Sequence, residues 1–308
     1  MGVLNRRSVL AVGLSSLAVA GASMSRVRPF SAPDPGNIFY ETGGIANTTV
    51  YRDFTGRTTR SLAINGSEDT LIMICAGQSL STDLITDTFS PTNGTKLDNY
   101  VWFNGTNWAA QDALLGTSWN GSTATSHNFN FRVADGIISN GKFDRVIIVP
   151  VAMSGTTVNL WVNDFVGEPT GYYRMVQTAI KKLKAQGITG TTTGVKWLFK
   201  WNQGESDTQQ STTQGNYTTD WNKLKALVSV DLPQMKFMIA KETRYIGNNS
   251  AAVQAAQAAA VNGVDTFVGE DMDSIGAGGR EGDDTHLNAT GGNSAATMGI
   301  AAITAITF

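Results

Sequence analysis

The sequence predicts an α/β fold, with a mainly parallel five-stranded sheet and helices on both of its faces. Two observations lead to this fold class. Short apolar runs of strand length alternate with longer segments whose apolar residues recur at helical spacing. The chain of 308 residues is also 41% hydrophobic and only 16% charged, which is typical of a globular protein with a substantial core.

Five apolar runs are expected to form the sheet. The first, 71–76, has six apolar residues in a row and ends at a glycine, as buried strands of parallel sheets do. The other strands are expected, in chain order, at 145–152, 195–201, 236–240 and 266–269, and 100–103 is a further candidate. Five helices are expected at 131–138, 172–186, 217–230, 250–261 and 291–306.

Residues 1–24 are expected to be an export signal that does not take part in the fold. Arg6-Arg7 is followed by an apolar stretch, 8–20, which is too short to span a membrane. The adjacent arginines fit a twin-arginine signal as well as an ordinary secretory one. Either signal implies a bacterial protein exported to the periplasm or beyond, with no stable membrane anchor once the signal is removed.

The rest of the chain is expected to form an irregular lead-in with short strands, 25–68, and one main domain, 69–308. A net charge of about −2 gives no basis for nucleic-acid binding. The single cysteine, Cys75, is expected to be a buried strand residue, and the only histidines are His127 and His286. We therefore expect no zinc site, no other metal and no cofactor. A calcium site at Glu270, Asp271 and Asp273 is a less favoured alternative to an exposed acidic loop.

Four polar segments stand out, and three of them directly follow predicted strands. They are Gly77-Gln78-Ser79, Ser154-Gly155-Thr156, the segment 201–207, and the segment 283–286, which precedes the last helix. The carboxyl ends of parallel strands are where such folds bind ligands. Ser79 is a candidate nucleophile, but a serine needs a base and donors for the oxyanion. His286, with a carboxylate three residues upstream, is the candidate base, whereas His127 has no acid nearby in sequence and is expected to be a structural or a surface residue.

These segments resemble the four sequence blocks of the SGNH/GDSL hydrolase superfamily, and they occur in the same order. The blocks read Gly-Gln-Ser at 77–79, Ser-Gly-Thr-Thr at 154–157, Trp-x-Gln-Gly-Glu-x-Asp at 201–207 and Asp-x-x-His at 283–286. More narrowly, the chain is similar to the sialate O-acetylesterase-like, carbohydrate acetylesterase branch over roughly 70–295. The resemblance implies a flavodoxin-like three-layer α/β/α sandwich.

The resemblance also implies a serine esterase that removes acetyl or other short acyl groups from a carbohydrate. Ser79 would attack the ester, His286 would carry the proton, and Asp283 would orient His286. The oxyanion hole would consist of the backbone N–H groups of Ser79 and Gly155 and the side-chain amide of Gln203.

Several alternatives stay open. Asn202 could replace Gln203 as the side-chain donor, and Asp284 could replace Asp283, although Asp-x-x-His is the family spacing. Ser154 stands where a second glycine is often found, while Glu205 and Asp207 are expected to brace their loop. The tryptophans Trp102, Trp108 and Trp119 could stack on sugars or pack in the core. The competing functions are a lipid or thioester hydrolase of the same superfamily and an inactive carbohydrate-binding protein.

Overall fold

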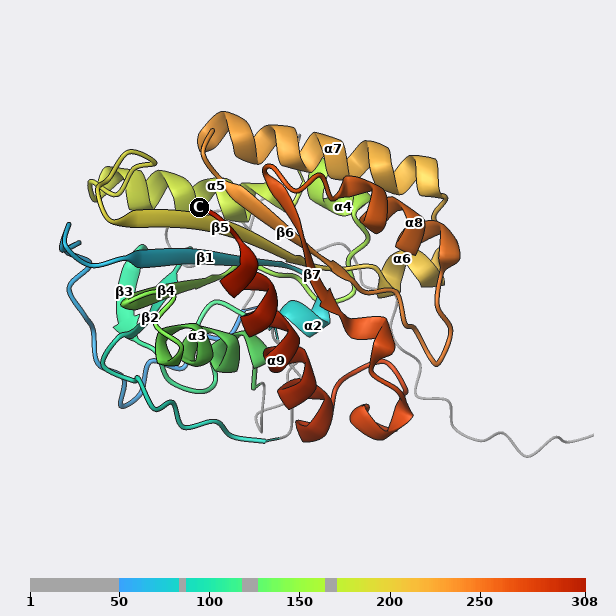
Figure 1. Cartoon of the computed structure of the whole chain (residues 1–308), viewed down its shortest axis with the longest axis horizontal. Helices are drawn as coiled ribbons and strands as arrows, with labels where there is room; N and C mark the ends of the chain where they lie inside the picture. The colour runs from blue at the N-terminus through green and yellow to red at the C-terminus, as the bar shows by residue number, and fades with distance from the viewer. Residues whose placement is uncertain (1–49, 83–86, 118–126, 164–170) are drawn as a thin grey trace, which may run out of the picture. The chain divides into compact units, whose positions relative to one another are not determined.

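The structure is a computed structural model that describes residues 50–82, 87–117, 127–163 and 171–308 (Figure 1). The chain divides into two compact units, Met1–Ser31 and Ala32–Phe308, and every described residue belongs to the second. The expected export signal, and the lead-in as far as residue 49, therefore lie outside the described residues.

The described part of the second unit is built on one seven-stranded sheet, with the strand order β3-β2-β4-β1-β5-β6-β7. Neighbouring strands are parallel, except that β3 is antiparallel to β2. The strands are β1 (Thr70–Gly77), β2 (Leu97–Val101), β3 (Thr106–Ala109), β4 (Arg145–Pro150), β5 (Val195–Asn202), β6 (Lys236–Lys241) and β7 (Thr266–Asp271).

This sheet has two strands more than the five that the sequence predicts. The additional strands, β2 and β3, form a hairpin at one edge. Their sequences, Leu-Asp-Asn-Tyr-Val and Thr-Asn-Trp-Ala, carry polar residues within the strands, so no continuous apolar run marks them. The candidate strand at 100–103 overlaps only the last two residues of β2.

Helices cover both faces of the sheet, which gives the predicted three-layer α/β/α sandwich (Figure 1). Along β1, Ile72 and Ile74 pack in the core beneath one layer of helices, whereas Leu71 and Met73 pack beneath the other. The first layer contains α5 (Tyr173–Ala185) and α7 (Gln214–Asp231), and the second contains α3 (Phe129–Ser139) and α9 (Ala289–Ala305). The other helices are α2 (Ser79–Thr82), α4 (Asn159–Val162), α6 (Glu205–Gln209), α8 (Ala251–Ala260), and the 3-10 turns η1 (Met272–Ser274) and η2 (Ala277–Gly279).

The five predicted helices are all present, and their ends differ from the prediction by no more than three residues. The starts of α3, α7 and α9 are set by capping side chains that precede the first apolar residue. Asn128, Thr213 and Asn288 each accept a hydrogen bond from a backbone N–H of the first turn. The sequence analysis began α7 at its first apolar residue, Tyr217, and so missed the turn before it.

The register of the three central strands brings their carboxyl ends to one edge of the sheet. In β1, Cys75 lies opposite Pro150 of β4, and Gly77 lies opposite Asn202 of β5. The segments that follow β1, β4 and β5 therefore leave the sheet side by side. Three of the four polar segments identified in the sequence begin at this edge.

Candidate active site

Ser79 lies at the point where the central strand turns into a short helix. The turn depends on Gly77, whose φ is 127° and whose Cβ, if present, would lie 1.9 Å from the carbonyl oxygen of Asn202. Only glycine fits there, and it lets the chain leave β1 directly beside β5. Ser79 follows as the first residue of α2, and only 4% of it is exposed.

His286 reaches Ser79 from the loop before α9, 207 residues further along the chain. Its Nε2 lies 2.9 Å from Ser79 Oγ, and its Nδ1 lies 2.5 Å from Asp283 Oδ2. An ionised carboxylate can only accept, so the proton of a neutral His286 is placed on Nδ1 and Nε2 is left to accept from the serine. The three side chains thus form one continuous hydrogen-bonded chain.

Asp283 is itself oriented by the backbone of its own loop. Its Oδ1 accepts from the N–H groups of Thr285 at 2.9 Å and His286 at 3.0 Å. The hydrogen bond from the His286 side chain, together with these two, holds the pKa of Asp283 well below its usual range. The carboxylate therefore remains ionised beside His286 at neutral pH.

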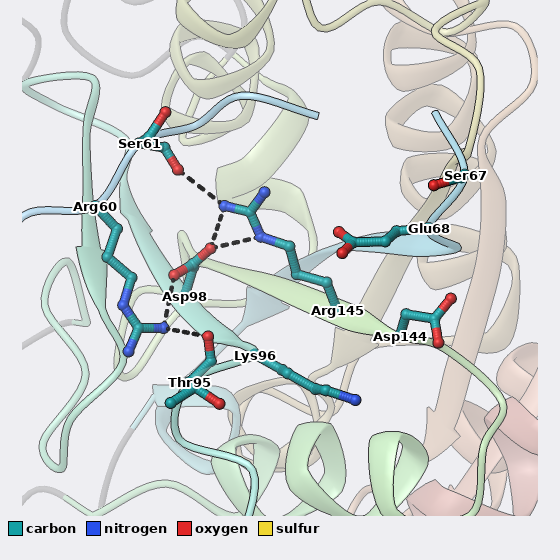
Figure 2. A pocket seen from close by; sticks show the side chains of 9 residues that line it. All are labelled: Arg60, Ser61, Ser67, Glu68, Thr95, Lys96, Asp98, Asp144 and Arg145. Carbon is teal, nitrogen blue, oxygen red and sulfur yellow. Dashed lines mark hydrogen bonds and ion pairs between the residues drawn. The ribbon is translucent and has the colours of Figure 1, made fainter. Parts of the chain in front are cut away.

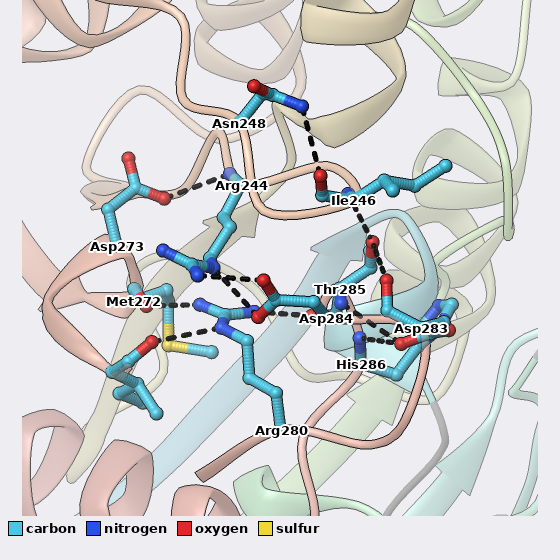
Figure 3. Close-up of polar contacts among 11 residues, drawn as sticks. Arg244, Ile246, Asn248, Met272, Asp273, Arg280, Asp283, Asp284, Thr285 and His286 are labelled. Atoms are coloured by element: carbon cyan, nitrogen blue, oxygen red, sulfur yellow. Dashed lines mark hydrogen bonds and ion pairs between the residues drawn. The ribbon is translucent and has the colours of Figure 1, made fainter. Parts of the chain in front are cut away.

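Asp284 turns away from His286 and pairs with Arg244 (Figure 3). Arg244 Nε donates to Asp284 Oδ1 at 3.1 Å, and Nη2 donates to Oδ2 at 2.9 Å. Of the two adjacent aspartates, the structure brings Asp283 to His286 and gives Asp284 a different partner.

A tight turn at 245–248 packs against the same loop. Tyr245 and Asn248 exchange two backbone hydrogen bonds, of 2.8 and 3.0 Å, around Ile246 and Gly247, which have φ values of 47° and 75°. The N–H of Ile246 also donates to Thr285 Oγ1 at 2.8 Å (Figure 3). Two successive positive φ values define a type I′ turn, in which a β-branched residue such as Ile246 is strained.

Arg280 holds the loop from inside, a role that the sequence analysis missed. The residue is 5% exposed, and its guanidinium donates to the carbonyl oxygens of Met272, Ile275 and Thr285 (Figure 3). The partners of its guanidinium are backbone carbonyl groups, and no pattern of acidic residues in the sequence indicates such contacts. The one available signal was its position within a glycine-rich segment next to His286.

The loop after β4 brings Gly155 to the same edge of the sheet. The N–H of Met153 donates to the carbonyl of Gly77 at 2.9 Å, so this loop begins against the end of β1. Gly155 is exposed and has a φ of 73°, a conformation that favours glycine. The next residue, Thr156, is buried and bonds back to the carbonyl of Met153 at 2.8 Å.

Gln203 is buried beneath this edge, where its –NH₂ is fully engaged and its Oε1 has no partner among the described residues. Its Nε2 donates to the carbonyl oxygen of Thr156 at 3.0 Å, to Gln78 Oε1 at 3.2 Å and to the carboxylate of Asp207. Asp207 also accepts from the N–H of Val158 at 2.9 Å and thereby links the loops after β4 and β5. Three acceptors surround the two hydrogens of the Gln203 amide, so that amide is committed to the protein.

A cluster of buried ionisable groups surrounds the neighbouring Asn202. Lys200 Nζ lies 2.6 Å from Asn202 Oδ1 and 2.8 Å from Glu270 Oε1, while Asn202 Nδ2 donates to Glu242 Oε2 at 3.0 Å. Burial raises the pKa of Glu242 to about 7 and raises that of Glu205, on which the charge of Glu242 acts in the same direction. The two glutamates therefore hold a shared proton close to neutral pH.

The other histidine and the described tryptophans have partners of their own. His127 Nδ1 lies 2.8 Å from the carboxylate of Asp112, a partner 15 residues earlier that the sequence analysis did not find. Trp102 is buried in the core, and Trp108 is half-buried with its ring 5.2 Å from that of Phe54. Trp119 lies outside the described residues.

The acidic residues Glu270, Asp271 and Asp273 do not form the exposed loop that the sequence analysis favoured, because the first two end β7, the third lies in η1, and Glu270 is buried. Asp271 Oδ1 accepts from the N–H of Ser274 at 3.1 Å, and Asp273 Oδ1 accepts from the N–H of Thr243 at 2.7 Å. Within the described ranges, no three His, Cys, Asp or Glu side chains are placed to hold a metal ion. Cys75 is buried in β1, and burial raises the pKa of its thiol to about 12. None of the described helices is long and apolar enough to cross a membrane.

A polar hollow of about 560 Å³ lies at the opposite edge, where the strands begin (Figure 2). Two arginines meet there on one buried carboxylate: Arg60 Nη1 donates to Asp98 Oδ1 at 3.2 Å, and Arg145 Nε donates to Oδ2 at 2.8 Å. Arg145 also binds the carbonyl oxygens of Ser61 and Ala63. These contacts fasten the end of the lead-in to the sheet, so we interpret this hollow as part of a structural clamp.

The comparison with protein families identifies the class of this protein. The family model described as "Carbohydrate esterase, sialic acid-specific acetylesterase" matches residues 70–304, which is well over half of the chain. The chain belongs to this family, within the SGNH-type hydrolases that its sequence blocks resemble, and is therefore an ester hydrolase of the acetylesterase class. A search of curated protein sequences found no match.

Solved structures agree with the fold. A protein from Arabidopsis thaliana, 17% identical, superimposes with a TM-score of 0.56 over 76% of this chain and 95% of its own. A carbohydrate acetylesterase from Xanthomonas citri, 15% identical, gives a TM-score of 0.50 over 76% of this chain and 55% of its own. At such identities the likeness shows that the fold is shared.

Proposed function

We propose that the protein hydrolyses acetyl esters of a carbohydrate through Ser79, His286 and Asp283. The observation that supports this proposal is the continuous hydrogen-bonded chain from Ser79 Oγ through the imidazole to the Asp283 carboxylate. A nucleophile within reach of a base that is oriented by a third group is the arrangement needed for acyl transfer.

The proposed reaction has two halves. Ser79 Oγ attacks the acetyl carbonyl carbon while His286 Nε2 takes the hydroxyl proton, and the imidazolium then gives that proton to the departing sugar oxygen. The C–O bond to the sugar breaks, and an acetyl-serine remains. A water molecule, deprotonated by the same nitrogen, attacks this ester and releases acetate, while the proton returns to Ser79. Throughout, Asp283 stabilises the imidazolium and keeps Nδ1 protonated.

The negative charge on the carbonyl oxygen requires donors at the same edge of the sheet. We propose the backbone N–H groups of Ser79 and Gly155, whose loops are joined by the bond between Met153 and Gly77. The family resemblance adds the side chain of Gln203 to this set. Gln203 contacts the loops after β1 and β4 that carry these two N–H groups, which supports a role for it in the oxyanion hole. Its own side-chain N–H groups, however, point to acceptors within the protein.

The proposal is tested by replacing the nucleophile. Ser79→Ala should abolish hydrolysis of p-nitrophenyl acetate and release of acetate from acetylated carbohydrates, with an unchanged thermal unfolding midpoint. Acetylated sialic acids, xylans and bacterial polysaccharides form the substrate panel, and an acyl-length series separates an acetylesterase from a lipid or thioester hydrolase. Turnover by Ser79→Ala at the parent rate would disprove the mechanism.

We also propose that the protein acts outside the cytoplasm and that 69–308 is its catalytic domain. The basis is the signal-like pattern at 1–24, with its paired arginines and small-residue cleavage sites. Fractionation of cells that express the full chain, followed by N-terminal sequencing of the exported form, tests both export and the cleavage position. A product that stays in the cytoplasm with Met1 intact would contradict the proposal.

A further inference from the structure

The side chain that immediately precedes the nucleophile has one half of its amide fixed by the protein. Gln78 is 3% exposed, and its Oε1 accepts from Gln203 Nε2 at 3.2 Å and from the N–H of Ser206 at 3.1 Å. Two donors fill the two lone pairs of this oxygen. The reverse orientation would place the –NH₂ of Gln78 against both donors, so the orientation of this amide is determined.

The other half of the same amide is not satisfied by the protein. Gln78 Nε2 donates to no described residue. The described structure also leaves this nitrogen open to solvent. Because Nε2 is open to solvent, it can pair with water in the free protein and exchange that water for an acceptor on the substrate. A donor of this kind, on the residue that precedes Ser79 in the chain, is suited to an acceptor that arrives with the substrate.

The two amides expected from the sequence are both engaged elsewhere. The hydrogens of Gln203 are directed at Thr156, Asp207 and Gln78, and Asn202 donates to Glu242. Either amide would have to break a buried hydrogen bond before it could reach a substrate. Gln78 would break none, because its bonds to the protein are all made through its oxygen and its backbone.

We propose that Gln78 Nε2 is the side-chain donor to the acyl oxygen of the substrate, and that Gln203 is a positioning residue that aims it. This inference rests on the proposed acyl transfer at Ser79. As Ser79 Oγ adds to the carbonyl, the oxygen gains negative charge and the hydrogen bond from Gln78 strengthens. The bond thus favours the transition state over the bound ester, and its loss should lower kcat more than it raises KM.

Replacement of Gln78 gives the first test. Gln78→Leu removes the donor at similar size, and kcat for p-nitrophenyl acetate should fall about 10²–10³-fold, with KM changed less than threefold. Gln78→Glu keeps the oxygen that Gln203 and Ser206 require but places a carboxylate oxygen where the –NH₂ was, so it should fold like the parent and lose more activity. The matched control is Gln209→Leu on the exposed face of α6, which should retain parent kcat.

A double-mutant cycle assigns the roles of the two glutamines. If Gln203 acts through Gln78, Gln203→Leu lowers kcat in the parent but has less than a threefold further effect on Gln78→Leu. Inhibition by a boronic acid that forms a tetrahedral adduct on Ser79 should weaken in parallel with kcat/KM across the set. A merely structural role would not produce this correlation.

The outcomes separate this inference from the proposed function. An inactive Ser79→Ala together with Gln78→Leu and Gln78→Glu variants at parent kcat would overturn the role of Gln78 and leave the serine mechanism intact. A full additional loss from Gln203→Leu in the Gln78→Leu background would assign the donor to Gln203. An active Ser79→Ala would remove the basis of both.

Discussion

Asp283→Asn is the substitution whose effect the geometry of the site defines most closely. It removes one charge and almost no volume. The N–H groups of Thr285 and His286, at 2.9 and 3.0 Å from Oδ1, require an oxygen at that position. The new amide must therefore place its oxygen there and its –NH₂ at the position of Oδ2, facing His286 Nδ1.

The size of the effect follows from this orientation. Reversing the amide would lose two hydrogen bonds worth about 1 kcal/mol each and set donor against donor, so the orientation is held by at least about 2 kcal/mol. Nδ1 must then accept, which moves the imidazole proton to Nε2, where it blocks proton transfer from Ser79. An aspartate-to-asparagine change that imposes the wrong tautomer costs about 10⁴ in kcat, or about 5.5 kcal/mol of transition-state stabilisation.

The assay is steady-state hydrolysis of p-nitrophenyl acetate, with circular dichroism as the measure of folding. Asp284→Asn is the matched control, because Asp284 pairs with Arg244 and has a φ of 52° that asparagine tolerates. It should keep kcat within about threefold of the parent. The reasoning is refuted if Asp283→Asn retains more than a tenth of parent activity, or if Asp284→Asn loses as much.

Three further substitutions test the supporting structure. Asp98→Asn, beneath Arg60 and Arg145, should lower the free energy of unfolding by about 2–3 kcal/mol in urea, while Lys96→Gln on the rim of the same hollow changes it by less than about 0.5 kcal/mol. The raised pKa values of Glu205 and Glu242 mean that the folded protein holds a proton which the unfolded chain releases near pH 4.5. Stability should therefore fall as the pH rises from about 5 through 7. Glu205→Gln supplies a permanent amide donor and should make this fall less steep in thermal melts. An equally steep fall in the variant would exclude the two glutamates as its source. Ile246→Asn should stabilise the protein by about 1 kcal/mol, because asparagine tolerates the left-handed backbone conformation of this position better than isoleucine does. Little packing is lost, since the side chain of Ile246 is 59% exposed. A lower urea midpoint for the variant would show that Ile246 is not strained.

The fold was predictable where burial leaves a continuous pattern. β1 is buried on both faces, so its apolar run is uninterrupted, and α5 shows a single apolar face. The hairpin of β2 and β3 was not predicted, because the polar residues Asp98 and Asn99 are buried within it. Their partners, two arginines and the backbone of Leu115, are distant in sequence and invisible to a local pattern.

The same distinction applies to the site. Ser79, Asp283 and His286 belong to short motifs whose spacing is local, and the structure places them in one hydrogen-bonded chain. The orientation of an amide depends instead on neighbours from other strands. No spacing within 201–207 indicates that Thr156 and Gln78 would occupy the hydrogens of Gln203, and only the assembled sheet edge reveals it.

The loop that carries His286 has a consequence for how such an enzyme could be switched off. Asp283 and His286 share one short segment, in which Arg280 bonds to the carbonyl oxygen of Thr285, while Arg244 pairs with Asp284 from the loop after β6. A displacement of the whole segment would leave the contact between Nδ1 and Oδ2 intact and lengthen only the gap between Nε2 and Ser79. In the proposed mechanism, the site thus consists of a His–Asp pair held within one loop and one distance, between Nε2 and Ser79 Oγ, that a movement of the loop would change. An inhibitor wedged into that gap would silence the serine, while the low-field proton resonance of the His–Asp pair would persist.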